Sequence, residues 1–176
     1  MTSPNTVSLS GHGLVLREWR DDDLDALREL FDDPEVAHWT PLASPFDRVA
    51  ATRYLARVRD NQARGERLHL AITTDGVEPR GEVMLNRVTG TIGYAVGAAY
   101  RGQRLAVRAL RLLTEHAHEA YRMPRVYLEI EQSNAASAAV ARSAGYTLTD
   151  AAPVLVEDKG REHTLLTWVH EKPTGA

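Results

Sequence analysis

The sequence predicts a single α+β domain of mixed α/β type, with a mixed, mostly antiparallel sheet of about seven strands flanked by about four helices. Two patterns lead to this prediction. Residues 92–146 read as a strand, a tight loop, a long helix, a strand and a short helix, and alternating apolar positions mark further strands on both sides. Because 176 residues suit one domain with a substantial core, we interpret 1–176 as one domain with loose ends at 1–12 and 171–176.

Composition excludes several classes of protein. Charged residues make up 26% of the chain and the net charge is −3, whereas general nucleic-acid binding rests on clustered positive charge. The absence of cysteine excludes disulfides, a thiol nucleophile and cysteine metal sites. No apolar run can span a membrane, and the amino terminus lacks an apolar signal core. We therefore expect a cytoplasmic protein that binds neither a metal ion nor a membrane.

The first strand and helix follow from alternation and from an acidic helix start. Residues 13–18 alternate, with Leu14 and Leu16 on one face. The acidic run at 21–23 stabilises the first turn of a helix, and apolar residues recur along one side as far as Phe31. We interpret the acidic run as helix capping. An alternative role for acidic residues here, attraction of a cationic amine, involves Asp32, Asp33 and Glu35.

The next helix and strand are separated from the first by a loop at 38–45. Residues 44–47 resemble a capping box with proline in the first turn, so we expect a helix from there to about Gly65. Residues 67–73 alternate as a strand, with His69 on the face opposite the leucines. A lone histidine on a strand is more often structural than a base, and we interpret His69 in that way.

Two further strands are predicted at 81–88 and 91–96, separated by a Thr-Gly turn. Gly93, Ala95 and Gly97 leave little side chain on one face of the second strand. Small residues allow another backbone or an extended ligand to approach closely. This strand is therefore a candidate ligand-binding strand.

A loop at 101–106 opens directly into a long helix that ends before Pro124. Unpaired N–H groups and the positive end of the dipole make a helix start suitable for an anion such as a pyrophosphate. One helix face is apolar. We expect the opposite, solvent-facing side to consist of Arg104, Arg108, Arg111, Glu115 and His118.

The remaining strands follow this helix. Residues 126–131 alternate and, after a crossover of this length, should run parallel to 91–96. A short helix follows from Asn134, and strands at 154–156 and 163–169 flank a hairpin turn at 158–160.

The stretch from residue 92 to 146 resembles the core of the GNAT superfamily of acyl-CoA N-acyltransferases, most closely its ribosomal-protein-alanine N-acetyltransferase branch. The family's pyrophosphate loop is Q/R-x-x-G-x-G/A. The residues Asn134, Ser137 and Gly145-Tyr146 have the spacing of a second family segment, N-x-x-S followed by G-[F/Y]. The resemblance implies the GNAT fold with a splayed pair of parallel strands. The matching loop residues here are Arg101, Gly102, Gln103, Arg104, Leu105 and Ala106.

The resemblance implies an acetyl-CoA site. The N–H groups of 102–106 would hold the pyrophosphate, with Arg101 and Arg104 adding charge. The backbone of Tyr94, Ala95 and Val96 would meet the pantetheine arm, and Asn134 would bond the pantetheine amide or only cap its helix. Arg104 replaces the motif glycine. An arginine is tolerated at this position if its φ is negative and is strained if its φ is positive.

The chemistry of acyl transfer needs few groups. Position 141, where many GNATs carry an acidic tyrosine, is alanine, and Ser137 matches the serine that replaces it in the ribosomal-protein branch. Glu157 is within one residue of that branch's catalytic glutamate, Glu82 and Glu129 are alternative bases, and water is a further route for the proton. The resemblance predicts transfer of an acetyl group to a protein N-terminus or a small amine.

Three alternatives to this function stay open. A GNAT-shaped module can bind a ligand or partner without catalysis, or the donor can be a longer acyl-CoA or an aminoacyl-tRNA. A homodimer is also possible for such a domain.

Overall fold

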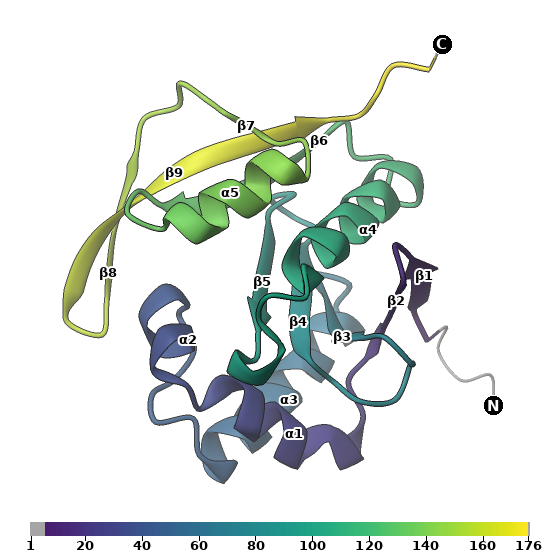
Figure 1. Ribbon diagram of the computed structural model, residues 1–176, viewed down its shortest axis with the longest axis vertical. Helices are drawn as coiled ribbons and strands as arrows, with labels where there is room; N and C mark the ends of the chain where they lie inside the picture. Colours follow the sequence, from purple (N-terminus) through teal and green to yellow (C-terminus); the bar gives the residue numbers. More distant parts are fainter. Residues whose placement is uncertain (1–5, 176) are drawn as a thin grey trace.

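Two antiparallel sheets and five α-helices make up the described part of the chain, residues 6–175, in this computed structural model (Figure 1). The strands are β1 (Ser8–Gly11), β2 (Leu14–Glu18), β3 (Arg67–Thr73), β4 (Gly81–Asn86), β5 (Ile92–Val96), β6 (Arg125–Glu131), β7 (Thr147–Leu148), β8 (Val154–Asp158) and β9 (Arg161–Glu171). The helices are α1 (Leu24–Phe31), α2 (Pro34–Trp39), α3 (Arg48–Ala63), α4 (Leu105–Glu119) and α5 (Ala135–Ser143), with short 3₁₀ helices at Asp21–Asp23 and Ala98–Tyr100.

The first sheet has the strand order β1-β2-β3-β4-β5, with every neighbouring pair antiparallel. The second sheet has the order β6-β9-β7, and β8 pairs with the other end of β9. β5 and β6 run parallel where the sheets meet, and in residues 6–175 a single bridge joins them, from Thr91 to Tyr127. The predicted splay of this parallel pair is confirmed, and it separates what was expected to be one sheet into two.

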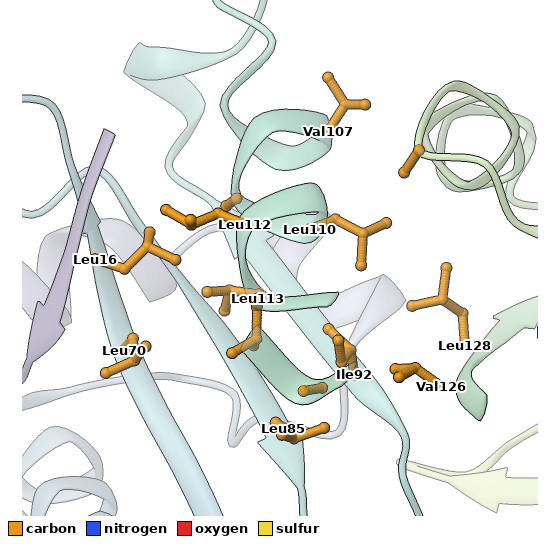
Figure 2. Packing of buried hydrophobic residues seen from close by; sticks show 14 of the residues in the cluster. Leu16, Leu70, Leu85, Ile92, Val107, Leu110, Leu112, Leu113, Val126 and Leu128 are labelled. Atoms are coloured by element: carbon orange, nitrogen blue, oxygen red, sulfur yellow. The ribbon is translucent and has the colours of Figure 1, made fainter. Parts of the chain in front are cut away.

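Helix α4 holds the two sheets together from one side. Its apolar side chains point toward strands of both sheets, with Leu110 and Leu113 fully buried among them (Figure 2). Leu85 and Ile92 meet them from the first sheet and Leu128 from the second. A continuous core under α4 therefore keeps the sheets together where backbone pairing is missing.

The other face of the first sheet is covered by α1 and α3, which lie at the bottom of Figure 1. Four aromatic rings pack edge to face there, with centroids 5.5–6.4 Å apart, and Phe31 is central among them. The buried ion pair of Arg17 with Asp23, 2.7 Å long, anchors the start of α1 to β2. In residues 6–175, none of the helices is long and apolar enough to cross a bilayer.

Several local predictions need correction. Residues 8–11, predicted to be loose, form β1 against β2. Part of the predicted loop at 38–45 belongs to α2, which starts with proline after the Asp33 cap and was missed because it is short. The next helix is capped by Asp47, whose side chain accepts from the N–H of Ala50, rather than beginning at Ser44.

His118 is also placed differently from the prediction. It is 3% exposed instead of facing solvent. Its Nδ1 donates to the carbonyl of Met123 at 2.7 Å, and its Nε2 lies 2.9 Å from Nδ1 of His170 on β9. The second sheet, which sequence periodicity cannot locate, covers the last turn of α4 and buries this position.

Candidate active site

The loop before α4 presents free backbone donors. Gly102 has φ +82°, and a Cβ added there would meet nothing within 4 Å, so the loop is open on that side. Arg108 is the first residue whose N–H bonds back into the helix, to the carbonyl of Arg104 at 3.2 Å. No side chain caps this helix end within the described chain. The first amides of α4 are therefore available to an anion.

Arg104 occupies the N-cap position of α4 in the left-handed region, with φ +57° and ψ +25°. Of the two alternatives for this position, the strained one therefore holds. A side chain in this conformation costs about 1–2 kcal/mol, whereas glycine adopts it freely. The exposed guanidinium of Arg104 has no hydrogen-bond or ion-pair partner in residues 6–175. A strained, unpartnered cation thus stands beside the free amides.

Arg101 is bound to α2. Its guanidinium lies 3.0 Å from Asp33 Oδ1 and 2.9 Å from Glu35 Oε2. Burial raises the pKa of the Asp33 carboxyl, but hydrogen bonds from Val36 N–H and Arg101 outweigh burial and hold this pKa below its usual range. Asp33 caps the start of α2, and Asp33 and Glu35 together bind Arg101 of the loop before α4. This contact gives these acidic residues a structural role.

The opposite end of α2 is held by the β8–β9 hairpin. Lys159 Nζ donates to the carbonyls of Ala37 and Thr40 at 2.7 and 2.8 Å. Arg161 on β9 makes a bidentate pair with Glu131 on β6, at 2.6 and 3.0 Å, which lowers the pKa of Glu131. α2 is thus clamped between the loop at 101–106 and the second sheet.

A cavity of about 500 Å³ lies at the splay between β5 and β6. One wall comes from β3, β4 and β5, the opposite wall from β6, β9 and the start of α5, and α2 and α3 cover it. Tyr94 and Ala95 of β5 line it, as do Asn134 and Ser137, whereas Val96 lies outside the lining and packs partly against the core. The structure therefore gathers several predicted residues around one cavity.

At the start of α5, Asn134 caps the helix and Ser137 faces the cavity. Asn134 Oδ1 accepts the N–H of Ser137 at 3.0 Å, which confirms the predicted cap. Ser137 Oγ accepts a hydrogen bond of 3.1 Å from the hydroxyl of Tyr94, across the splay. The family resemblance implied a role only for the backbone of Tyr94, although strand alternation puts its side chain on the face opposite that of Ala95. Ala141 is fully buried in the core.

A buried polar cluster forms the floor of the cavity on the α3 side. Glu82 is 6% exposed, and Trp19 Nε1 donates to its Oε2 at 2.7 Å. The hydroxyl of Tyr54 donates to Glu82 Oε1, and burial with this carboxylate raises the pKa of Tyr54. His69 Nδ1 lies 3.5 Å from the same oxygen. The predicted structural histidine and the alternative base Glu82 are therefore neighbours.

Glu157 is not part of the cavity lining. β8 pairs Glu157 with Glu162 of β9, and both are exposed. The cavity-lining residue His163 pairs with Val156, so side chains of even-numbered β8 residues share its face and Glu157 points to the other. A shift of one residue in the register of β8 would therefore turn Glu157 from the outer face toward the cavity. Glu129 lines the cavity but is exposed.

Comparison with known proteins identifies the family. The family model for the acetyltransferase (GNAT) domain matches residues 13–147. A Salmonella typhimurium acetyltransferase that modifies the N-terminal serine of ribosomal protein L7/L12 is 18% identical, with a TM-score of 0.78 over 93% of this chain and 97% of that one.

Two further solved structures resemble the chain at similar levels. RimJ from Mycobacterium smegmatis, in complex with CoA-disulfide, is 22% identical, with a TM-score of 0.75 over 92% of this chain and 85% of that one. The microcin C7 self-immunity acetyltransferase MccE, in complex with acetyl-CoA and AMP, is 16% identical, with a TM-score of 0.78 over 92% and 94%. These likenesses concern the fold. The family match covers most of the sequence, and the chain therefore belongs to the GNAT family of acetyltransferases.

Proposed function

We propose that this protein transfers an acetyl group from acetyl-CoA to a primary amine, with both substrates bound at once. The observation that carries the proposal is the cavity at the splay, which has a hydroxyl, Ser137, on one side and a buried carboxylate, Glu82, on another. Direct attack of an amine on a thioester requires no covalent enzyme intermediate, and most of the rate can come from alignment of the two substrates.

The donor side of the proposal rests on the loop at 101–106. Free amides and the helix dipole suit the two linked phosphates of coenzyme A. Arg104 adds a cation that nothing in the described chain neutralises. The single bridge between β5 and β6 leaves strand edges to which the amides of a pantetheine arm can bond. MccE and RimJ were solved with acetyl-CoA and CoA-disulfide, which supports the same donor here.

On the acceptor side we assign the base to Glu82. The attacking amine must lose a proton, and a desolvated carboxylate is a suitable acceptor for it. Glu82 accepts from Trp19 and Tyr54 and lies 3.5 Å from His69 Nδ1, and the carboxylate keeps a free lone pair beyond these three partners. The cross-strand pairing of Glu82 with Ala95 sets it beside the ligand-binding strand. Glu129 stays the alternative base, and Glu157, on the outer face of β8, has no support from its position.

The acceptor is proposed to be the amino group of a protein N-terminus. The Salmonella neighbour modifies such a group on a ribosomal protein. Of the carboxylates that line the cavity, Glu131 is paired with Arg161, so Glu82 and Glu129 are the two that suit an amine arriving as a cation. Small amines are the second acceptor class, and a cytoplasmic location stays a prediction.

A thermal-shift titration followed by a turnover assay tests the proposal. Acetyl-CoA should raise the melting temperature, because a ligand that binds only the native state stabilises it. Release of the CoA thiol should then depend on an added N-terminal peptide. Ser137→Ala serves as the matched variant: it should bind acetyl-CoA normally and turn over more slowly.

Two outcomes oppose the proposal. No thermal shift at millimolar acetyl-CoA would point to another acyl donor. Binding without turnover on any peptide or small amine would favour the non-catalytic module. The strained Arg104 and the alanine at position 141 are the observations that favour this second function.

A further inference from the structure

The hydrogen bond between Tyr94 and Ser137 joins two elements that backbone pairing leaves apart. Tyr94 lies on β5 and Ser137 in the first turn of α5, which follows β6. The phenol donates to Ser137 Oγ at 3.1 Å and reaches the Ser137 carbonyl at 3.5 Å. Both residues line the cavity at the splay. This bond therefore crosses the gap at the point where the two sheets separate.

The donor and acceptor roles in this bond can be assigned. Burial raises the pKa of the Tyr94 hydroxyl above its usual range, although the bond to Ser137 opposes this, so the phenol keeps its proton. The phenol hydrogen points toward Ser137, since the Ser137 carbonyl at 3.5 Å can only accept, and the phenol then occupies one lone pair of Ser137 Oγ. The serine proton then has to point elsewhere, and no other acceptor for it is found in residues 6–175.

We propose that Tyr94 is a positioning residue that fixes the Ser137 hydroxyl as a hydrogen-bond donor to the sulfur of the bound thioester. The inference rests on the proposed function. During transfer the carbon–sulfur bond breaks and the carbon–nitrogen bond forms, the electron pair of the broken bond goes to sulfur, and the amine proton goes to the base. Ser137, held in place by Tyr94, stabilises the negative charge on the departing sulfur, which finally takes a proton from solvent.

This arrangement accounts for the alanine at position 141. Many members of the family carry an acidic tyrosine there, but Ala141 is fully buried in this chain. Tyr94 brings a phenol to Ser137 from a different element, β5 instead of α5. A serine alone is a weak, freely rotating donor. A second hydrogen bond that fixes its rotamer lowers the entropy cost of donation and polarises the hydroxyl.

The pKa of the CoA thiol bound to the protein tests this inference without any acceptor. Ultraviolet absorbance of the thiolate is followed during a pH titration of the CoA complex. If Ser137 donates to sulfur, the bound thiol should titrate about one pH unit below free CoA, which corresponds to a tenfold preference for the thiolate. Ser137→Ala should abolish this difference, and Tyr94→Phe should remove most of it.

Tyr146→Phe is the matched control. Tyr146 is also a buried tyrosine bonded to a hydroxyl, that of Thr114 at 2.7 Å, but it does not line the cavity. Its loss should lower stability and leave the thiol pKa of bound CoA unchanged. If Tyr94→Phe behaves like this control, Tyr94 is only structural and the inference is overturned.

Turnover gives an independent measurement. Tyr94→Phe should lower kcat about tenfold with little change in KM for acetyl-CoA. The double variant with Ser137→Ala should be no slower than Ser137→Ala alone, because Tyr94 acts through the serine. Additive losses would contradict this coupling. Failure of the wild-type protein to bind CoA would instead refute the proposed function, so the two failures are distinguishable.

Discussion

Replacement of Arg104 by glycine should stabilise the folded protein and lower its affinity for acetyl-CoA. The native φ of +57° costs an ordinary residue about 1–2 kcal/mol. Glycine avoids this cost, but it also lowers stability by about 0.4–1 kcal/mol because it increases the conformational entropy of the unfolded chain. The difference is about 0–1.6 kcal/mol with a central value of roughly 0.8 kcal/mol in the free energy of unfolding, or about 2–3 °C in melting temperature for a chain of this size.

Arg104→Ala separates conformation from charge. Alanine loses the guanidinium as glycine does, but it keeps the strained left-handed backbone at the N-cap of α4. Urea unfolding of the two variants should thus differ by the conformational energy alone, with glycine the more stable. Equal stability of the glycine and alanine variants would refute the conclusion that residue 104 is strained.

Binding by the same two variants measures the charge. Both should bind acetyl-CoA about three- to tenfold more weakly than the wild type, which corresponds to roughly 0.7–1.4 kcal/mol. Arg104→Lys should retain most of the affinity. The difference from wild type should shrink at high salt, because the side chain is exposed and its charge is screened. Unchanged affinity in the glycine variant would remove Arg104 from the phosphate site.

Three further predictions concern the base, the histidines and the core. Glu82→Gln should lower kcat at least roughly 100-fold while acetyl-CoA still raises the melting temperature, and near-normal turnover would exclude Glu82 as the base. Burial, together with the charge of His118 in the case of His170, lowers the pKa of His170 and of His116. As pH falls through about 6.5, the unfolded chain therefore takes up protons that the folded chain does not, so less urea should be needed to unfold the protein. His170→Gln should reduce this dependence of stability on pH. A wild-type stability that does not change with pH in this range would contradict the prediction. Leu110→Ala should destabilise by about 2–5 kcal/mol in urea, and a loss below about 1 kcal/mol would mean that the core under α4 is loosely packed.

Local patterns were sufficient to predict most elements of the fold. The apolar stripe of α4, the alternation of β3, β5 and β6, and the cap at Asn134 all depend on residues close in sequence. The splay of the parallel pair was predicted only through family resemblance, and the separation into two sheets was not predicted. Nothing in the local sequence of β5 or β6 reports that their ladder ends after one bridge.

The candidate site shows where sequence reasoning fails. His118 has the spacing of a solvent-facing residue but is buried by β9, more than 40 residues further along the chain. Glu157 missed the cavity by one position, because register decides the face of a strand and sequence fixes register only loosely in an exposed hairpin. Glu82 and Tyr94 gain their importance from partners on other elements, and only the tertiary structure brings those partners within hydrogen-bonding distance.

The parting of β5 from β6 also bears on the energetics of ligand entry. An extended molecule that adds itself between two paired strands must first rupture a ladder, and each broken bond subtracts from affinity. In the described chain no strand pairing has to be broken beyond the bridge between Thr91 and Tyr127. Each hydrogen bond between the ligand and a strand edge therefore adds to the affinity without the loss of an existing bond. Exposed strand edges usually invite aggregation, but these two edges face each other across a cavity that α2 and α3 cover, instead of lying on the outside of a sheet.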